Sequence, residues 1–234
     1  MPEKLRQDGN GTFLREVLPH AVQAHDLVYD LGGGSQPYLS VARKSELGAR
    51  VVGLDIDAGE LAAAPAGAYD RIIAHDLCTF QGEGDADVVI CQATLEHVPD
   101  TAGAMRAMAS TVRSGGRIFI FAPCRNAMFA RLNRVLPENV KRRVLFALFP
   151  HKGEGHDGFK AYYDRCTPSQ IEALARANGL EVEERRLFWM SSYFSVFVPA
   201  FLAWRLTQLL FYLVMQNDAA ETFIYVLRKP ETRM

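Results

Sequence analysis

Three aspartates and a run of glycines are the residues whose types and spacing point to a ligand site. Asp30 stands two residues before Gly32 in the segment VYDLGGGSQPY (28–38), and Asp55 and Asp76 each end a short apolar run. Glycines that follow a strand let the backbone turn sharply and approach a ligand closely. Carboxylates at strand ends accept hydrogen bonds from hydroxyl or amino groups. An acid beside the glycine turn suits a cationic ammonium group better than a pyrophosphate.

The glycine spacing distinguishes this segment from the nicotinamide- and flavin-binding type. The dinucleotide fingerprint needs glycine at its first, third and sixth positions. Gly32 and Gly34 fill the first two, but Pro37 stands at the sixth, where it supplies neither an N–H nor a flexible φ. Taken singly, the glycines also fit an ordinary tight turn, and each acid fits a helix N-cap or a solvated loop. Their order along the chain favours one shared ligand crevice.

Short apolar runs alternate with helical stretches in the first half of the chain and provide the elements that position these residues. We predict strands over 27–31, 50–55, 71–76, 86–92 and 117–123, and helices over 12–24, 38–47 and 101–113. Strands that alternate with helices form βαβ units around a parallel sheet that is buried on both faces. We therefore predict an α/β, doubly wound fold. Its neighbouring strands would meet at their carboxyl ends in one crevice.

The second half of the chain departs from this alternation. Residues 125–152 are both apolar and basic, so within one domain covering 1–234 we predict a helical insertion or lid over 125–165. The basic residues contact an anionic headgroup or a phosphate in one interpretation. In the other, they form a solvated helical face.

Helix and strand signals return after the insertion. The segment CTPSQIEALARANGL (166–180) is typical of a helix, with Thr167 as the N-cap and Gln170 completing a capping box. Two further strands are predicted at 181–189 and 221–229. They can supply the closing pair of a sheet.

The most apolar segment, 194–216, lies between these two strands. Arg205, Gln208, Tyr212 and Gln216 recur along it at helical spacing and form a narrow polar stripe on an otherwise apolar helix. The charge of Arg205 argues against a membrane span. Two interpretations stay open. The helix either lies in a membrane interface, or it is covered in a homodimer or over an acceptor pocket.

Length, charge and cysteine content limit the class of protein. The 234 residues, 49% of them apolar, suit one α/β domain with an elaboration. The net charge of -1 gives no global basic field, which argues against a nucleic-acid partner. The four cysteines form no C-x-x-C pair, which favours buried thiols in a reducing compartment. The polar N-terminus lacks an apolar signal core, so we expect a cytoplasmic protein, membrane-associated if the apolar helix lies at an interface.

Four segments, in this order, resemble the motifs of the class I S-adenosylmethionine-dependent methyltransferases, in particular the small-molecule group that includes the ubiquinone/menaquinone methyltransferases. They are DLGGGSQ (30–36), LDID (54–57), HDL (75–77) and QATLEHVPD (92–100). The resemblance implies a seven-stranded Rossmann-like sheet, mostly parallel with an antiparallel last strand. It also implies methyl transfer from the cofactor S-adenosylmethionine to a small acceptor. The apolar segments favour a hydrophobic or lipid-linked one.

The resemblance also implies a set of cofactor-binding residues. Asp55 would bind the ribose hydroxyls, with Ile56 packed on the adenine, and Asp76 would contact the adenine edge, with Leu77 on its face. Gln92 would lie near the methionine carboxylate or amine, and the acid and glycines of the first loop would hold the methionine end. The complete set is Asp30, Gly32, Gly33, Gly34, Asp55, Ile56, Asp76, Leu77 and Gln92.

His97, which follows the fourth predicted strand, is the candidate catalytic residue. It acts as a general base if the acceptor must lose a proton, and otherwise shapes the acceptor pocket. No metal site is predicted, because the histidines of the insertion lack a recognised ligand spacing. Candidates for acceptor or lid contacts are Tyr38, His151, His156, Tyr162 and Tyr163.

A second function has to be weighed against methyl transfer. A non-catalytic module could retain the methyltransferase fold and use the apolar segment to bind a membrane or a partner protein. The acids at three successive strand ends argue against this alternative, because a module without a small ligand has no need of them.

Overall fold

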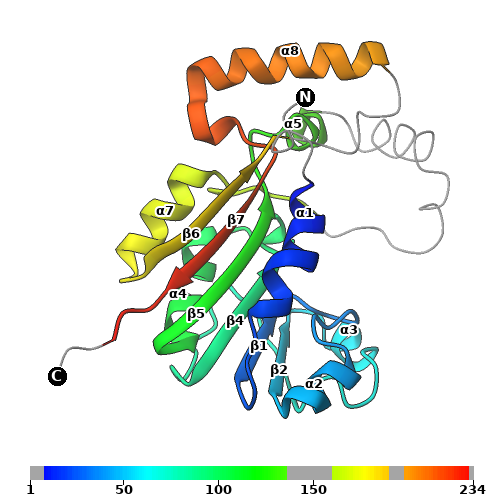
Figure 1. The fold of residues 1–234 in the computed structure, drawn as a ribbon, viewed down its shortest axis with the longest axis vertical. Coiled ribbons are helices and arrows are strands. Elements are labelled where there is room, and N and C mark those ends of the chain that lie inside the picture. The colour runs from blue at the N-terminus through cyan, green and yellow to red at the C-terminus, as the bar shows by residue number, and fades with distance from the viewer. Residues whose placement is uncertain (1–7, 136–159, 190–197, 232–234) are drawn as a thin grey trace.

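Seven strands form the sheet around which the chain is arranged (Figure 1). The computed structural model describes residues 8–135, 160–189 and 198–231. The strands follow the spatial order β3-β2-β1-β4-β5-β7-β6. Their bounds are β1 Leu27–Leu31, β2 Arg50–Asp55, β3 Arg71–Ala74, β4 Ala86–Gln92, β5 Val112–Pro123, β6 Glu181–Phe188 and β7 Thr222–Arg228. The predicted doubly wound α/β fold is confirmed.

The pairing of the strands brings distant parts of the sequence to one edge. β1 to β5 are parallel, whereas β7 lies antiparallel between β5 and β6. Leu31, at the end of β1, stands opposite Leu54 in β2 and Cys91 in β4. The carboxyl ends of these three strands are therefore level, which is the arrangement that forms a ligand crevice in open α/β sheets. The antiparallel strand implied by the resemblance is confirmed.

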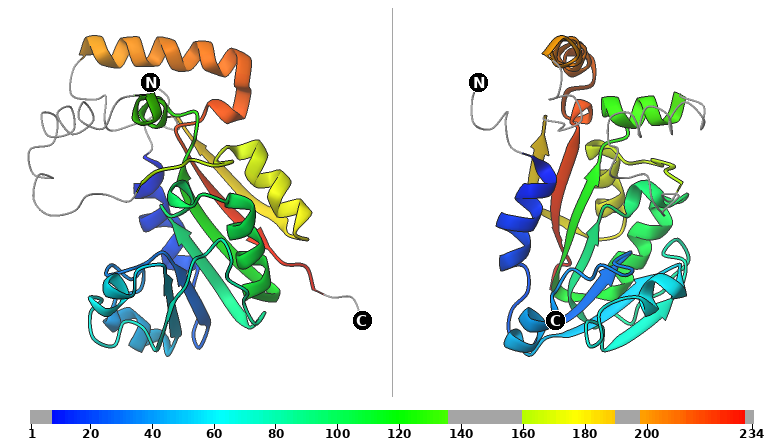
Figure 2. Two further views of the ribbon diagram at one scale, coloured as in Figure 1. Left: turned by 180° about the vertical axis from the view of Figure 1, so that it is seen from behind. Right: turned by 90° about the vertical axis from the view of Figure 1, so that its right-hand side faces the viewer.

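Two hydrophobic cores cover the two faces of the sheet. Tyr29 and Leu31 belong to the core that includes α4 (Thr101–Thr111) and α7 (Pro168–Ala177). Val28, directly before Tyr29, belongs to the opposite core, which contains the N-terminal helical segment. The alternation follows from the two-residue period of a strand. Figure 2 shows the N-terminal segment on one side of the sheet, and α4 and α7 on the other.

The N-terminal helical segment covers Gly9–His20, earlier than the predicted range of 12–24. It consists of α1 (Gly9–Thr12), a π-helical turn η2 (Phe13–Val17) and a 3₁₀ turn η3 (Leu18–His20). Pro19, which has no backbone N–H, lies in the 3₁₀ turn. The helical segment ends directly after it. Two shorter helices, α2 (Val41–Leu47) and α3 (Ala58–Ala62), follow β1 and β2.

The boundary between α4 and β5 also differs from the prediction. α4 ends at Thr111, two residues before the predicted end, and β5 begins at Val112, within the range that was predicted to be helical. Val112 pairs with Ala86 of β4, so sheet pairing extends the strand through residues whose local glycine signal favours a turn. The glycine effect remains in the backbone of Gly115, whose φ is 79°.

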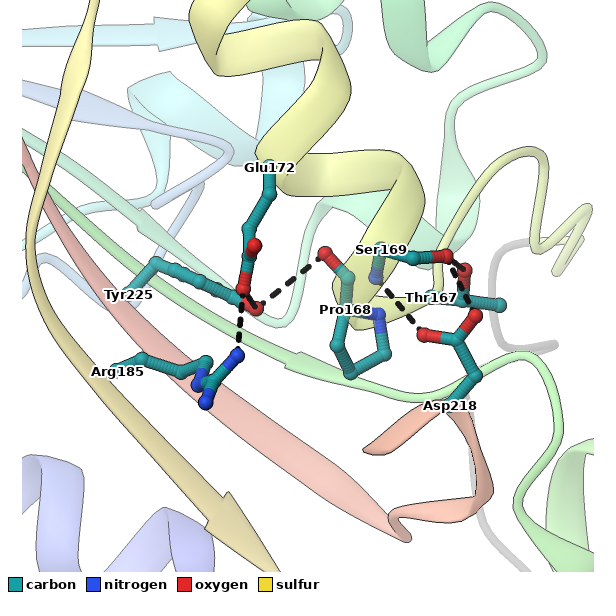
Figure 3. A network of polar contacts seen from close by, with 7 residues as sticks. All are labelled: Thr167, Pro168, Ser169, Glu172, Arg185, Asp218 and Tyr225. Carbon is teal, nitrogen blue, oxygen red and sulfur yellow. Dashed lines mark hydrogen bonds and ion pairs between the residues drawn. The ribbon is translucent and has the colours of Figure 1, made fainter. Parts of the chain in front are cut away.

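The start of α7 is capped by a residue that is remote in sequence. Thr167 occupies the N-cap position as predicted, but its side chain makes no capping hydrogen bond to the helix backbone. Instead, the backbone N–H of Ser169 donates to Asp218 over 2.8 Å, and Figure 3 shows this contact. Nearby, the hydroxyl of Tyr225 donates to Glu172 over 2.8 Å, which ties α7 to β7. The predicted capping box is therefore replaced by a tertiary cap.

Two helices stand at the carboxyl-terminal edge of the sheet. α5 (Met128–Val135) follows β5, and α8 (Val198–Met215) with the short turn η7 (Gln216–Ala219) connects β6 to β7. Figure 1 shows α8 lying across this end of the molecule, beyond α5. Within the described ranges, no helix is long and apolar enough to cross a membrane. The central part of the predicted lid, 136–159, lies outside the described residues.

Candidate functional site

Asp30, Asp55 and Gln92 lie on the same face of the sheet. Asp30 pairs with Gly53 in β2 and with Ile90 in β4. Asp55 and Gln92 are each two residues further along their strands, and the two-residue period of a strand places them on the face to which Asp30 belongs. The register of the sheet thus brings Asp30, Asp55 and Gln92 to one face, whereas Asp76 lies beyond the end of β3 at Ala74 and its place in the crevice stays a prediction.

Asp30 supports the glycine loop from below. Its side chain is only 4% exposed, and Oδ2 accepts a hydrogen bond from the backbone N–H of Tyr38 over 2.8 Å and one from the Tyr69 hydroxyl over 3.4 Å. Burial raises the pKa of Asp30 to about 6, and these hydrogen bonds partly oppose the rise. A cationic ligand nearby would favour its ionised form. Support of the loop is therefore a role of Asp30 in addition to the predicted ligand contact.

Gly32 makes a turn that no other residue accommodates in the same way. Its φ is 74°, and a Cβ built on it would lie 2.4 Å from Oγ1 of Thr94. Thr94 cannot easily move away, because its hydroxyl donates toward the carbonyl oxygens of Leu31 (3.0 Å) and Gln92 (3.1 Å). The loop after β1 is thus packed directly against the residues after β4. Thr94 lies within the segment QATLEHVPD, but no role was predicted for it, because its contact with Gly32 depends on packing between distant segments.

The end of β2 presents a carboxylate and an exposed apolar side chain together. Asp55 is half-buried, and its Oδ1 accepts a hydrogen bond from the N–H of Asp57 over 3.0 Å. Burial raises the pKa of Asp55. Ile56, the next residue, is 66% exposed, so it presents an open apolar surface beside this carboxylate. The pair is suited to a ligand that offers hydroxyl groups beside a flat apolar ring.

Asp76 and Leu77 follow β3 but have different surroundings. Asp76 is partly exposed, and its Oδ1 accepts from the N–H of Cys78 over 2.8 Å. Leu77 is only 5% exposed and belongs to the core shared with α4. The role of Asp76 at an adenine edge and that of Leu77 at its face stay predictions. The burial of Leu77 shows that it also has a structural role.

Gln92 joins the strand ends to the N-terminal segment. Its side-chain amide donates to Oδ1 of Asn10 in α1 over 3.1 Å. On the same side, the phenol of Tyr38 donates to the carbonyl oxygen of Leu18. These two contacts place the N-terminal helical segment against both the glycine loop and the end of β4. No motif in the sequence indicates this contribution, because Asn10 is a single polar residue in a polar N-terminal stretch.

A 3₁₀ turn after β4, η4 (Leu95–His97), carries the candidate base. His97 is partly exposed, and its Nδ1 lies 3.3 Å from the carbonyl oxygen of Lys160, 63 residues away in the sequence. The backbone N–H groups of Tyr162 and Tyr163 donate to the carbonyl oxygen of Glu96 over 2.8 and 3.0 Å. The structure therefore brings together His97 and two of the predicted acceptor or lid residues.

The predicted acceptor residues have different exposures. Tyr162 is 41% exposed, with the Lys160 ammonium 4.9 Å from the centre of its ring, whereas Tyr163 is buried. Tyr38 is partly buried and holds the loop contacts described above. His151 and His156 lie outside the described residues. Roles in acceptor binding stay predictions for all five.

Glu96 is a buried acid that motif reading did not assign to any role. In the described part of the chain, its Oε2 is buried without a hydrogen-bond partner, and its Oε1 lies 3.8 Å from Nε2 of His97. Burial raises the pKa of Glu96 to about 8. The carboxyl group therefore keeps its proton at neutral pH, and His97 has a neutral neighbour.

This pKa makes the stability of the protein depend on pH. The folded protein holds the Glu96 proton up to about pH 8, whereas the unfolded chain releases it near the ordinary pKa of 4.5. The contribution is thus complete at low pH and is lost as the pH rises through about 8. We expect Glu96→Gln, which cannot titrate, to remove about 2 kcal/mol of the decrease in unfolding free energy between about pH 6 and pH 8. Urea unfolding at several pH values measures it.

A matched replacement serves as the control for this experiment. Glu181→Gln changes an exposed glutamate at the start of β6 and is expected to leave the pH profile of stability as it is in the unaltered protein. A profile of Glu96→Gln that runs parallel to that of the unaltered protein would contradict the assignment.

Comparison with known proteins gives a consistent picture. Residues 29–120 match the family model described as a methyltransferase domain. The chain is 33% identical over 168 residues to a ubiquinone biosynthesis O-methyltransferase from Cupriavidus pinatubonensis, a match that covers 68% of this chain and 61% of that protein. The chain thus spans less than two thirds of the length of this relative. A protein of the same name from Xanthomonas axonopodis pv. citri is 31% identical over 192 residues, with coverage of 78% and 74%.

A solved structure shares the fold. The crystal structure of an S-adenosylmethionine dependent methyltransferase from Mesorhizobium loti superposes with a TM-score of 0.60 at 18% identity and covers 96% of this chain and 99% of that one. At this level of identity the likeness concerns the fold, and the function has to be argued from the site.

Proposed function

The chain belongs to the S-adenosylmethionine-dependent methyltransferases, and from this premise we propose that it transfers a methyl group from S-adenosylmethionine to a hydroxyl oxygen on a hydrophobic aromatic acceptor. The observation that carries the proposal is the placement of Asp30 and Asp55 on one face of the sheet, on either side of the loop from Gly32 to Gly34. This placement combines a tight backbone turn with two carboxylates at neighbouring strand ends.

The residues at the strand ends fit this cofactor. At Gly34, whose φ is 48°, a Cβ would lie 3.4 Å from Oδ2 of Asp55, so the bare backbone keeps space open beside that carboxylate. Asp55 would accept hydrogen bonds from the ribose hydroxyls, and the exposed Ile56 would pack on the adenine. Asp30 and Gln92, on the same face, would hold the methionine end. When bound, S-adenosylmethionine supplies a methyl group that its sulfonium charge already activates.

The class of acceptor is proposed from the names of the relatives together with the apolar character of α8. Two relatives over 30% identical are named ubiquinone biosynthesis O-methyltransferases. That name specifies methylation at oxygen in the formation of a quinone. An acceptor of this chemistry has an aromatic hydroxyl and an apolar body. The apolar character of α8, which connects β6 to β7, agrees with such an acceptor.

The protein would position the acceptor hydroxyl, exclude water from the reacting atoms and supply a base for the hydroxyl proton. The residues at the strand ends would orient the acceptor hydroxyl toward the bound cofactor, which would supply the methyl group, so that a C–O bond forms in place of the C–S bond. The hydroxyl proton must leave, and His97 is proposed to take it. A carbonyl oxygen accepts only, so the contact of Nδ1 with Lys160 places the ring proton on Nδ1 and the lone pair on Nε2. This is the tautomer that a base requires.

Cofactor affinity tests the carrying observation directly. We expect Asp55→Asn to weaken binding of S-adenosylhomocysteine by about tenfold, because an amide replaces one of two acceptor oxygens by a donor. Isothermal titration calorimetry measures the dissociation constant. Asp85→Asn, at an exposed acid between β3 and β4, is the matched control and is expected to bind like the unaltered protein. Equal affinity of both variants would contradict the ribose role.

The alternative function, a non-catalytic module, makes a different prediction. A module would bind no S-adenosylhomocysteine, or bind it without any methyl transfer to an alkylated catechol. Assays with radiolabelled donor and such a catechol distinguish the two functions.

A further inference from the structure

α8 lies at the surface of the molecule, but its exposed side is apolar rather than polar. Its outward residues are aliphatic and between 56% and 79% exposed, and they recur at helical spacing along one face: Leu202, Leu206, Leu209, Leu210, Leu213 and Val214. We call these six residues the leucine face. Two residues of the predicted polar stripe point the other way, because Gln208 is buried and Arg205 partly buried, whereas Tyr212 and Gln216 are exposed. The water-facing side of a helix is normally its polar side.

The opposite side of α8 is held firmly to the fold. The indole N–H of Trp204 donates to the buried Glu221 over 3.0 Å, and Arg205 donates to the carbonyl oxygen of Trp189 over 2.8 Å. The guanidinium of Arg131 in α5 lies 3.4 Å from the centre of the Phe211 ring. The aromatic side chains thus anchor the helix, and its orientation is fixed. These contacts fix the rotation of α8 about its axis, and the leucine face therefore points outward.

We propose that the leucine face lies in the surface of a lipid bilayer. A helix that presents an apolar face outward can lie in the interface plane, with that face in the boundary between headgroups and acyl chains. Anionic lipid is compatible with this face, because neither α5 nor α8 contains an acidic residue and Arg134 of α5 is exposed, whereas Arg131 and Arg205 make the inward contacts described above. The helix cannot span the bilayer, in accord with the absence of a spanning helix among the described residues.

A second copy of the chain fits the leucine face less well. An 18-residue helix is about 27 Å long, and a strip about 10 Å wide along it covers roughly 300 Å². Even if the relief of the side chains doubles this area, it falls short of the about 800 Å² that each partner contributes to a standard interface. Interface hot spots are also enriched in Trp, Tyr and Arg, whereas leucine and valine are under-represented. Of the aromatic residues of α8, Trp204 is buried, and Phe211 and Tyr212 contact Arg131 and Trp189 of the same chain.

Membrane contact through the leucine face would bring the site close to a lipid-like acceptor, an argument that rests on the proposed function. β6 ends at Phe188 and β7 begins at Thr222, which pairs with Pro123 at the end of β5. α8 therefore lies at the carboxyl-terminal edge of the sheet, the edge that carries Gln92 and His97. A protein resting on α8 would hold this edge toward the membrane that contains a lipid-like acceptor.

Vesicle binding by the full chain tests the proposal without cofactor or acceptor. We expect co-sedimentation with vesicles of phosphatidylcholine and phosphatidylglycerol, weaker binding to phosphatidylcholine alone, and a decrease with added salt. Leu206→Gln/Leu213→Gln is expected to lower the partition coefficient by about tenfold or more. The matched control, Ile72→Gln/Val182→Gln, changes two exposed apolar residues on the edge strands and should bind like the unaltered chain.

Several results would overturn the proposal. These are absence of vesicle binding by the unaltered chain, equal binding by the leucine-face variant, and a dimer in light scattering that this variant dissociates. Should the double variant unfold, Leu209→Trp gives a second readout, because its fluorescence must shift to the blue and be quenched by brominated acyl chains. Titration with S-adenosylhomocysteine without vesicles separately tests the proposed function, so either idea can fail alone.

Discussion

Replacement of His97 by glutamine is expected to lower kcat for methylation of an alkylated catechol by about 10²- to 10⁴-fold, the usual contribution of a general base. The reason is the geometry of η4, in which the contact with Lys160 leaves the lone pair on Nε2. The dissociation constant for S-adenosylhomocysteine should stay the same, because the proposed cofactor contacts lie on other residues. Steady-state kinetics with calorimetry measures both quantities.

The choice of acceptor separates a base from a residue that only shapes the pocket. A nitro-substituted catechol is already ionised at the assay pH and needs no base, so His97→Gln should cost little with it. An equal loss of kcat with both acceptors would show that His97 positions the acceptor. His20→Gln, at an exposed histidine of η3, is the matched control and should leave both rates unchanged.

Replacement of Gly32 by alanine is expected to weaken S-adenosylhomocysteine binding by about a hundredfold or more and to lower the melting temperature. The new Cβ would lie 2.4 Å from Oγ1 and 2.5 Å from Cγ2 of Thr94, distances that force the loop or the threonine to move. The φ of 74° adds the strain of a left-handed conformation. Calorimetry and thermal unfolding measure the two effects.

Two further variants separate the collision from the backbone strain. Gly179→Ala has nearly the same φ, 71°, but nothing within 4 Å of its new Cβ, so it should show only the strain, about 1 kcal/mol of stability, and no loss of cofactor binding. Gly32→Ala/Thr94→Gly should recover part of the lost affinity, because the colliding side chain is removed. If the double variant binds no better than Gly32→Ala, the contact with Thr94 is not the cause.

Stability and activity can be examined independently in these variants. The pH dependence assigned to Glu96 is read from unfolding, the role of Asp55 from cofactor affinity, and that of His97 from turnover. Vesicle binding concerns α8, which shares no residue with these three measurements. A failure in one experiment therefore leaves the others interpretable.

The sequence by itself determined the sheet and the strand-end acids. β1, β2 and β4 have the predicted bounds because apolar runs buried on both faces are a local signal that needs no tertiary information. The positions of Asp30 and Asp55 follow directly, since a residue at the end of a parallel strand has only one edge on which to lie. The order of the motifs added the antiparallel last strand.

Only the tertiary structure decided how those elements meet. A Cβ added at Gly32 would meet Thr94, and the acid that caps α7 is Asp218. Both contacts join segments that are far apart in the sequence, so local sequence patterns do not predict them. Glu96 has an unusual pKa through burial, which a sequence does not show. The polar stripe of α8 predicted two sides for the helix but not which of them faces water. The side that faces water depends on where the rest of the fold provides hydrogen-bond partners for Trp204 and Arg205. Because those partners hold this side of α8 against the fold, the leucines are exposed.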